Sequence, residues 1–386
     1  MNSVERERKI VIFSAQYLPH MGGVETFTSH IAAELVELGC DVSIVCLTGD
    51  IKEPKTEIED SEVTVYRFPA IPLLSGRYPI SLATSDIRSC VESISPSHIV
   101  INARFYPHSV LGAIIARKQG LVPIVIEHGS AHLVLGNKLL DKSVALIEHP
   151  MTKAIKATSP LFFGVSHSCN EWLKHFGIKS SGTIQNAIDA DFFVNQGSGR
   201  SFRCELGIEE SAFIVSFIGR LVPEKGVSQL LDAARLVPEC HFIFAGEGPL
   251  KKKLVNESPI NVHYVGRLSS PDTSALLQQA NLFCLPSRSE GFATTLLEAS
   301  ACGTPSLVTN VGGSMEIIPN EDYGTIVGSA DPCLLAKEIK RLINDHELLL
   351  HQGRNVYKLT RDEFSWKSTA KALLEACSAS QATKSF

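Results

Sequence analysis

The residues most suggestive of chemistry lie in segment 285–305, where two acids, Glu290 and Glu298, stand eight positions apart. On an ideal helix, eight positions correspond to a rise of ~12 Å and a rotation of ~80°, so the two carboxylates would not chelate one small ion together. They could instead hold the two ends of an elongated polyhydroxylated ligand, while a helix N-terminus between them offers N–H groups to an anion. A nucleotide sugar has this shape. The alternative is a capping glutamate followed by a solvated one on a surface helix.

Two cations, Arg220 and Lys225, follow a strand-like run in a loop bracketed by Gly219 and Gly226. Cations in such a loop can offset the charge of a departing diphosphate and so take the place of a metal ion. Either residue alone would be interpreted as an ordinary charge on an exposed loop. Together with the two glutamates they favour a functional site.

Two further candidates lie in the first half of the chain. Gly22 and Gly23 link the first strand to the first helix, where the missing Cβ atoms let a phosphate or a sugar approach the backbone. His128 ends a strand, and its near-neutral titration suits proton transfer or contact with sugar hydroxyls, although a histidine there can also cap a turn. The sequence has neither a Walker loop nor a three-glycine dinucleotide fingerprint.

The elements that must position these residues alternate along the chain. Continuous apolar runs are typical of strands covered on both faces, and they are separated by segments with helical periodicity. The predicted strands are 9–13, 42–47, 63–68, 99–101, 122–126, 161–165 and 183–185, then 213–218, 241–245, 262–265, 282–285, 306–308 and 325–327. This pattern predicts an α/β protein with two Rossmann-like, doubly wound parallel sheets. Because ligands bind beyond the carboxyl ends of parallel strands, two such sheets facing each other would enclose a central cleft.

A polar stretch at 195–203 is the best candidate for a linker between the two sheets. We therefore predict an N-terminal domain at 1–194 and a second domain at 195–361. The remaining segment, 362–386, contains an amphipathic helix at 366–376.

Composition limits the partners. The 386 residues carry a formal net charge of −5, which disfavours nucleic acid. No run approaches the ~20 apolar residues that cross a bilayer, and the N-terminus, with charges of both signs, is unlike a signal peptide. Ten scattered cysteines without a C-x-x-C pair are typical of a reducing compartment, so the predicted location is cytoplasmic. A partly amphipathic basic stretch is either a solvated helix face or a peripheral contact with the inner membrane surface; its residues are Lys138, Lys142, Lys153 and Lys156.

Five features, in this order, resemble the retaining glycosyltransferases of the GT-B architecture, in particular glycosyltransferase family 4. They are Gly22-Gly23, the strand end Glu127-His128-Gly129, Asn186-Ala-Ile-Asp189, the loop Gly219-Arg220…Lys225-Gly226, and the segment from Glu290-Gly-Phe to Glu298-Ala. The resemblance spans nearly the whole chain, and the last segment is highly specific.

The resemblance implies a nucleotide-sugar donor, UDP- or GDP-linked, held mainly by the second domain. Arg220 and Lys225 would then contact the diphosphate, and Glu298 would contact the ribose hydroxyls. The remaining donor contacts implied in this way are Glu290, Gly291 and Phe292 at the sugar, Gly22 and Gly23 over the phosphates, and His128 beside the sugar. The helix at 366–376 would cross back onto the first domain.

Asp189 and Asp191 spell the Asp-x-Asp pattern with which glycosyltransferases of the other major architecture hold a divalent ion. We interpret them instead as the end of the turn at Asn186, because Arg220 and Lys225 can already compensate the negative charge of the leaving group. No metal and no other cofactor is therefore expected.

The expected function is transfer of a sugar from a nucleoside diphosphate to a hydroxyl of a glycan, a lipid-linked glycan or a small molecule, as in polysaccharide biosynthesis. The family implies retention at the anomeric carbon. A same-face route, in which the leaving phosphate helps to deprotonate the acceptor, is favoured because no second carboxylate stands out as a nucleophile. Two alternatives stay open: a sugar-nucleotide epimerase or hydrolase on the same scaffold, and a non-catalytic nucleotide-sugar-binding subunit.

Overall fold

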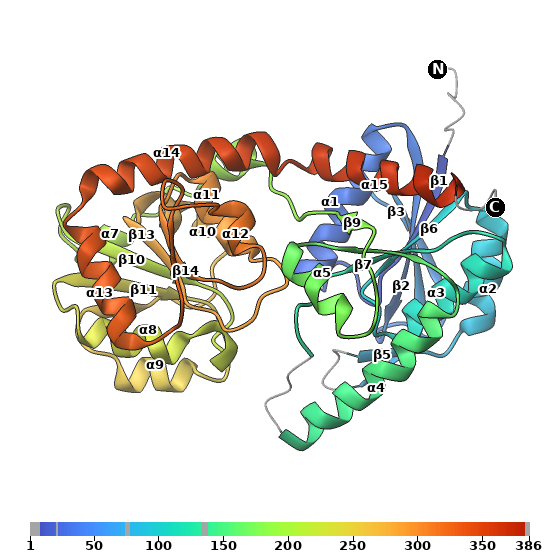
Figure 1. Ribbon diagram of the computed structural model, residues 1–386, viewed down its shortest axis with the longest axis horizontal. Helices are drawn as coiled ribbons and strands as arrows, with labels where there is room; N and C mark the ends of the chain where they lie inside the picture. The colour runs from blue at the N-terminus through green and yellow to red at the C-terminus, as the bar shows by residue number, and fades with distance from the viewer. Residues whose placement is uncertain (1–7, 21, 74–77, 133–137, 383–386) are drawn as a thin grey trace. The chain divides into compact units, whose positions relative to one another are not determined.

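The computed structural model describes residues 8–20, 22–73, 78–132 and 138–382, without the side chains of 138–145. The chain divides into two compact units (Figure 1). Unit 1 comprises Met1–Asn186 and Trp366–Phe386, and unit 2 comprises Ala187–Ser365. Each unit has its own sheet and its own covering helices.

The sheet of unit 1 has nine strands within the described residues, in the order β3-β4-β2-β1-β6-β7-β8-β9, with β5 paired to β4. All pairs are parallel except those of β3 and β5 with β4. The strands are β1 (Arg8–Phe13), β2 (Cys40–Thr48), β3 (Lys55–Ile58), β4 (Thr64–Leu73), β5 (Tyr78–Ser81), β6 (His98–Asn102), β7 (Ile124–Glu127), β8 (Leu161–Gly164) and β9 (Gly182–Thr183). Central strands such as β6 and β7 are buried along their whole length, because helices cover both faces of a parallel sheet.

The helices of unit 1 are α1 (Gly23–Glu37), α2 (Thr84–Ile94), α3 (Pro107–Lys118), α4 (Lys138–Lys156), α5 (His167–Lys174) and α15 (Trp366–Ala382). The C-terminal helix α15 packs against α1, and its Trp366 ring stacks on the His30 ring with a centroid distance of 4.7 Å. No helix among the described residues has the length and hydropathy needed to cross a membrane.

Unit 2 contains a six-stranded sheet within the described residues, in the order β12-β11-β10-β13-β14-β15, with every pair parallel. Its strands are β10 (Phe213–Ile218), β11 (Cys240–Ala245), β12 (Val262–Tyr264), β13 (Leu282–Leu285), β14 (Ser306–Thr309) and β15 (Thr325–Val327). Its helices are α6 (Ala190–Asn195), α7 (Phe202–Leu206), the 3-10 turn η1 (Pro223–Lys225), α8 (Val227–Arg235), α9 (Lys251–Glu257), α10 (Ser270–Gln279), α11 (Thr294–Ala301), α12 (Ser314–Ile317), α13 (Pro332–Ile343) and α14 (His346–Glu363).

The predicted α/β class with two largely parallel sheets is confirmed, but the division of the chain differs from 1–194, 195–361 and 362–386. The first boundary falls after Asn186, because α6 packs against α10 and α11 and so belongs to unit 2. The second falls after Ser365, because α14 continues unbroken through the predicted boundary at 361. The polar stretch at 195–203 lies within unit 2. There, Gln278 and Gln279 of α10 donate hydrogen bonds to the backbone carbonyls of Val194 and Arg200.

Candidate active site

Three loops of unit 2 follow neighbouring strands of the parallel sheet. Strand β13 lies between β10 and β14, and all three point the same way. They lead into the loops 219–226, 286–293 and 310–313. Because the carboxyl ends of parallel strands meet at one edge of a sheet, the predicted cations and the first predicted acid are brought to the same place.

The side chains of Lys225 and Glu290 form an ion pair at this edge. Lys225 Nζ lies 2.6 Å from Glu290 Oε1 and 2.7 Å from Oε2, and the Ser287 hydroxyl donates to Oε1 at 2.6 Å. Only 18% of the Lys225 side chain and 8% of the Glu290 side chain are exposed. An ammonium group has three donors, so Lys225 can bond both carboxylate oxygens and still offer one N–H to a ligand.

Two glycines let the three loops approach so closely. Gly226 has a φ of +72°, and a Cβ there would lie 2.1 Å from the carbonyl oxygen of Pro286. Gly312 has a φ of +59°, and its Cβ would lie 2.6 Å from the Cβ of Glu290. Both positions need glycine for its positive φ and for its lack of a side chain. The backbone that holds the Lys225–Glu290 pair therefore depends on glycine at positions 226 and 312.

Arg220 differs from Lys225 in having no partner. Its side chain is exposed, and it makes no hydrogen bond or ion pair within the part of the chain that the structure describes. Arg220 lies two residues after the end of β10 and five positions before Lys225. An exposed guanidinium and a largely buried ammonium in one loop are groups that can bind a multivalent anion.

Phe292 is placed as a core residue. It is 8% exposed, its ring lies 6.1 Å from the Phe364 ring, and a Cβ on Gly313 would come within 2.6 Å of it. A ring packed in this way leaves the backbone of Gly291 and Phe292 as the part of this segment that could meet a sugar.

Glu298 lies on α11 and has no charged partner or hydrogen bond for its side chain among the described residues. Burial raises the pKa of this carboxyl to about 7, since the charged form is poorly solvated there. The N-cap residue of α11, Ala293, supplies no side-chain cap, so the first N–H groups of the helix lack that partner. Glu298 is thus a carboxyl that a hydroxylated ligand could ionise.

Gly22 and Gly23 belong to unit 1, where they begin α1. Gly22 is the N-cap, and a Cβ there would lie 2.3 Å from Oε2 of Glu25, whose side chain folds back over it. Burial raises the pKa of the Glu25 carboxyl, against the opposing effect of His20, whose Nδ1 lies 3.5 Å from Oε1. Gly23 has open space where its Cβ would be. A Cβ at Gly22 would displace the Glu25 carboxylate, whereas the position of Gly23 is open.

His128, also in unit 1, is held by a chain of hydrogen bonds. The Thr28 hydroxyl donates to the carbonyl of Val24 at 2.7 Å and accepts from Asn102 Nδ2 at 2.7 Å. His128 Nε2 then donates a hydrogen bond to Asn102 Oδ1 at 3.3 Å. Burial lowers the pKa of His128 to about 3, so the ring is neutral. The network assigns the hydrogen to Nε2 and leaves Nδ1 as an acceptor, suited to a hydroxyl donor.

The Asp189-x-Asp191 pair has other partners than a metal ion. Asp189 is the N-cap of α6, and its Oδ1 accepts from the backbone N–H of Phe192 at 2.9 Å. Asp191 Oδ1 accepts from the Tyr357 hydroxyl at 3.2 Å. These contacts agree with the interpretation of the pair as the end of a turn.

The basic stretch is only partly described. Lys138 and Lys142 have side chains outside the described residues. Lys153 is exposed, but Lys156 Nζ donates to the carbonyls of Phe176 and Gly177 at 2.8 and 3.1 Å. Lys156 therefore fastens α4 to the end of α5, and membrane contact stays a prediction for the rest.

Sequence reasoning missed the residues that hold the predicted ones in place. Ser287 and Gly312 fix Glu290, and both lie within or beside the motif that carries it. Asn102 and Thr28 fix His128, but they come from β6 and α1, far from His128 in the sequence. A polar residue closing an otherwise apolar strand, as Asn102 closes β6, was the one available signal.

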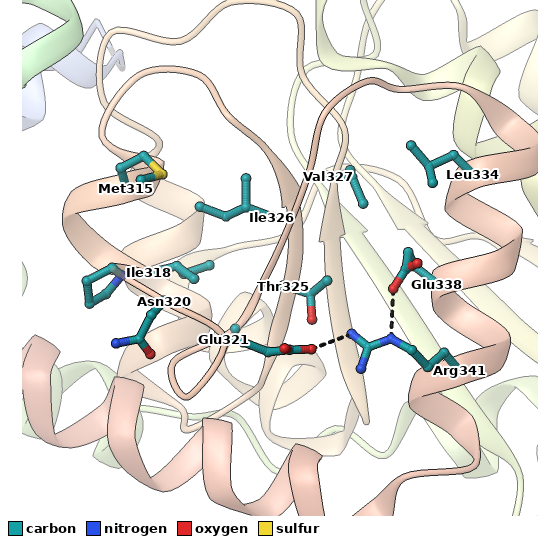
Figure 2. Close-up of a pocket in the computed structure, with 12 residues that line it drawn as sticks. Met315, Ile318, Asn320, Glu321, Thr325, Ile326, Val327, Leu334, Glu338 and Arg341 are labelled. Carbon is teal, nitrogen blue, oxygen red and sulfur yellow. Dashed lines mark hydrogen bonds and ion pairs between the residues drawn. The ribbon is translucent and has the colours of Figure 1, made fainter.

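Another pocket of unit 2, of about 450 Å³, is lined by none of the predicted site residues (Figure 2). Its one arginine, Arg341, is bonded to Glu321 at 3.0 Å and to Glu338 at 2.8 Å. Because Arg341 is already paired with both acids, this pocket is a weaker candidate for anion binding than the loop of Arg220.

Comparison with known proteins covers most of the chain. Residues 21–192 match the family model described as Glycosyltransferase Family 4, and residues 200–359 match Glycosyl transferases group 1. The chain is similar to "Uncharacterized glycosyltransferase MJ1178" of Methanocaldococcus jannaschii, with 27% identity over 92% of this chain and 94% of the relative. It is also similar to an Escherichia coli UDP-Gal:alpha-D-GlcNAc-diphosphoundecaprenol alpha-1,3-galactosyltransferase, with 24% identity over 88% of this chain and 89% of the relative.

Among solved structures, the chain resembles Anabaena Alr3699/HepE in complex with UDP-glucose. The TM-score is 0.70 at 17% identity, and the match covers 96% of this chain and 100% of that chain. At this identity the likeness shows a shared fold.

Proposed function

Since the chain is a glycosyltransferase of the GT-B architecture and belongs to family 4 and group 1, we propose that its donor is a nucleoside-diphosphate sugar. The sugar would pass to an acceptor hydroxyl on a glycan, a lipid-linked glycan or a small molecule. The transfer would retain the anomeric configuration and need no metal ion or other cofactor.

The Lys225–Glu290 ion pair, in the same loop region as the exposed Arg220, is the observation that carries this proposal. A departing diphosphate gains negative charge as the sugar–phosphate bond breaks, and two cations that contact it lower the cost of that charge. Glu290 fixes the position of Lys225 before the donor arrives, so little reorganisation is needed during the reaction. Arg220 is solvated until a ligand binds and can then make a bidentate contact with phosphate oxygens.

Glu298 is the residue that we propose to bind the ribose, at the other end of the donor. Two ribose hydroxyls can donate to one carboxylate, and they would favour the ionised form of a group whose pKa burial has raised to about 7. The names of two similar proteins contain a uridine nucleotide, UDP-Gal for the Escherichia coli relative and UDP-glucose for the Anabaena structure. A UDP-sugar is therefore the first donor to test, and a GDP-sugar the second.

A same-face route to retention is consistent with the groups in unit 2. A two-step route would need a nucleophilic carboxylate at the anomeric carbon, about 5 Å from the acid that assists it. Glu290 already binds Lys225 through both oxygens, and Glu298 is proposed to bind the ribose. The leaving phosphate, held by Arg220 and Lys225, is then the remaining base for the acceptor proton.

A panel of UDP- and GDP-sugars tests the donor. At 100 times its dissociation constant, a true donor stabilises the fold by about 2.7 kcal/mol, which appears as a rise in Tm. Release of nucleoside diphosphate that depends on an acceptor would support transfer, whereas release without one would indicate a hydrolase or an epimerase. Proton NMR of the product reads its anomeric configuration, and inversion would refute retention. Unchanged turnover with EDTA is expected.

A further inference from the structure

Three histidines from separate elements of unit 1 form a cluster that the proposed transfer does not use. His132 follows β7, His149 lies on α4, and His175 is the C-cap of α5. One ring nitrogen of each lies within 4.8 Å of the others. The ring centroids form a nearly regular triangle, with sides of 6.3, 5.4 and 5.5 Å.

One ligand of this triangle is already oriented. Oε2 of Glu148 lies 2.9 Å from Nδ1 of His132, and Glu148 is buried. The carboxylate therefore accepts the Nδ1 proton and leaves the Nε2 lone pair of His132 free to bind a cation. A carboxylate that holds the far nitrogen of a histidine in this way is the usual second shell of a metal site. Glu148 precedes His149 on the same helix, so α4 supplies both a ligand and an orienting group.

The charges behind the cluster also favour a cation. Arg104 lies 2.5 Å from Glu127 and 3.3 Å from Glu148, and all three side chains are almost fully buried. Two carboxylates thus share one guanidinium in these contacts. A cation on the histidine triangle would offset part of their negative charge, whereas three neutral imidazoles would not.

The position of His175 at the end of a helix also favours a cation. His175 ends α5, where the helix dipole favours positive charge. The Trp172 ring stacks on it with a centroid distance of 4.9 Å and an angle of 4°, and it meets the His132 ring edge-on at 4.8 Å. Trp172 thus forms a wall beside two of the three histidines.

We propose that His132, His149 and His175 bind one divalent transition-metal ion, with Zn²⁺ as the principal candidate. Imidazole nitrogens suit Zn²⁺, and three of them with one water complete a tetrahedral shell. Nitrogens on such a shell are about 3.3 Å apart for Zn–N distances of about 2.05 Å. His149 and His175 are exposed, so rotation of their side chains can close the triangle from 4.8 Å. The ion would join α4 and α5 to the segment after β7, and it shares no residue with the proposed donor site.

Direct titration tests the site. The full chain, made without a histidine tag and with the exposed Cys204 and Cys333 changed to serine, is titrated with Zn²⁺ by calorimetry. One Zn²⁺ per chain is expected. His149→Ala and His175→Ala should each weaken binding at least tenfold, and Glu148→Gln should weaken it by roughly 10- to 100-fold. His167→Ala is the matched control, since it changes an exposed histidine on α5 that is not in the triangle.

Trp172 provides a second reading of the same event. With Trp366→Phe, Trp172 is the only tryptophan left, and Cu²⁺ bound beside it should quench its fluorescence. The quenching should disappear when His149 and His175 are both changed to alanine. Circular dichroism of that variant checks that it is folded. The proposal is wrong if wild type and the double variant bind Zn²⁺ equally, or if no Zn²⁺ binds below millimolar concentration.

Discussion

Glu290 and Glu298 belong to one short segment, yet the protein treats their charges in opposite ways. Glu290 is bonded through both oxygens to Lys225 and accepts a hydrogen bond from the Ser287 hydroxyl. Glu298 has no such partner in the part of the chain that the structure describes, and burial alone raises its pKa to about 7. The loop thus holds a charge that the protein has already compensated, and the helix holds one that is not compensated.

This contrast separates two kinds of work in the proposed donor site. A compensated pair is fixed in place before the ligand binds, which suits groups that must stabilise a charge developing in the reaction. An uncompensated carboxyl changes its protonation when a hydroxylated ligand arrives, which suits recognition and makes it sensitive to pH. The predictions below test each half of this difference.

The largest effect is expected at Lys225. Lys225→Met removes one cation of the proposed diphosphate site, so turnover should fall by roughly 10³-fold. It also removes the Lys225 ammonium from the buried Glu290 carboxylate, at a cost of about 3 kcal/mol in the free energy of unfolding. Thermal melts and nucleotide-release rates measure the two effects separately.

The double variant Lys225→Met/Glu290→Gln distinguishes the two roles of the pair. It also removes the carboxylate charge that Lys225 balanced, so most of the lost Tm should return while turnover stays roughly 10³-fold below wild type. If transfer returned together with stability, the pair would be structural only, and its place in the proposed mechanism would be lost.

Arg220→Ala should give the next largest effect on activity. Arg220 is exposed and makes no ion pair among the described residues, so its removal should leave Tm within about a degree of wild type. Turnover with the best donor should fall by roughly 10²-fold, because one of two phosphate-binding cations is gone. Arg288→Ala, in the neighbouring loop, is the control for a general loss of positive charge. A full transfer rate for Arg220→Ala would exclude it from the diphosphate site.

The sequence predicted the parallel sheets and the position of the candidate loops, because buried parallel strands appear as continuous apolar runs that end in glycine-rich turns. The edge strands β3 and β5 were missed: they are short, and most of their residues are at least partly exposed, so no apolar run marks them. The 18-residue helix α14 was missed as well, since its residues are polar on average and only five of them are buried.

Within the candidate site, the sequence indicated which residues matter but not which of them pair. Lys225 and Glu290 are 65 positions apart, and nothing in either loop shows that they touch. Their pairing depends on the adjacency of β10 and β13, strands that are not consecutive in the chain. The histidine triangle could not be predicted from the sequence either, because its members come from a loop, a helix and a helix end that only the folded chain brings together.

The pH dependence of donor affinity tests the other half of the comparison. A carboxyl pKa raised from 4.5 to about 7 means that the folded protein holds a proton that the unfolded chain releases. The stability it contributes is therefore present below about pH 4.5 and is lost as the pH rises through 7. Donor binding to the ionised form should instead strengthen about tenfold between pH 6 and 8, with release of a proton. Calorimetry in two buffers of different ionisation enthalpy measures that proton.

Glu298→Gln is the matched control for this titration. It keeps the shape of the side chain and removes its ionisation, so the affinity for the donor should become independent of pH over the same range. A nucleotide sugar is the proper ligand, because its diphosphate does not titrate there, whereas the terminal phosphate of a free nucleoside diphosphate does. An unchanged pH profile in Glu298→Gln would remove Glu298 from the donor site.

The smallest effect is expected in unit 1, at the hydrogen bonds that orient His128. Burial lowers the pKa of His128 to about 3, so this residue should add no limb to the pH–rate profile between 5 and 8. Thr28→Val removes the acceptor that fixes the Asn102 amide, and without it the amide can turn its other end toward His128. The loss of one hydrogen bond, about 1 kcal/mol, corresponds to a roughly fivefold lower kcat. Thr28→Ser keeps the hydroxyl and should retain the rate, so equal losses in both variants would mean that the methyl group, and not the hydrogen-bond chain, is what His128 requires.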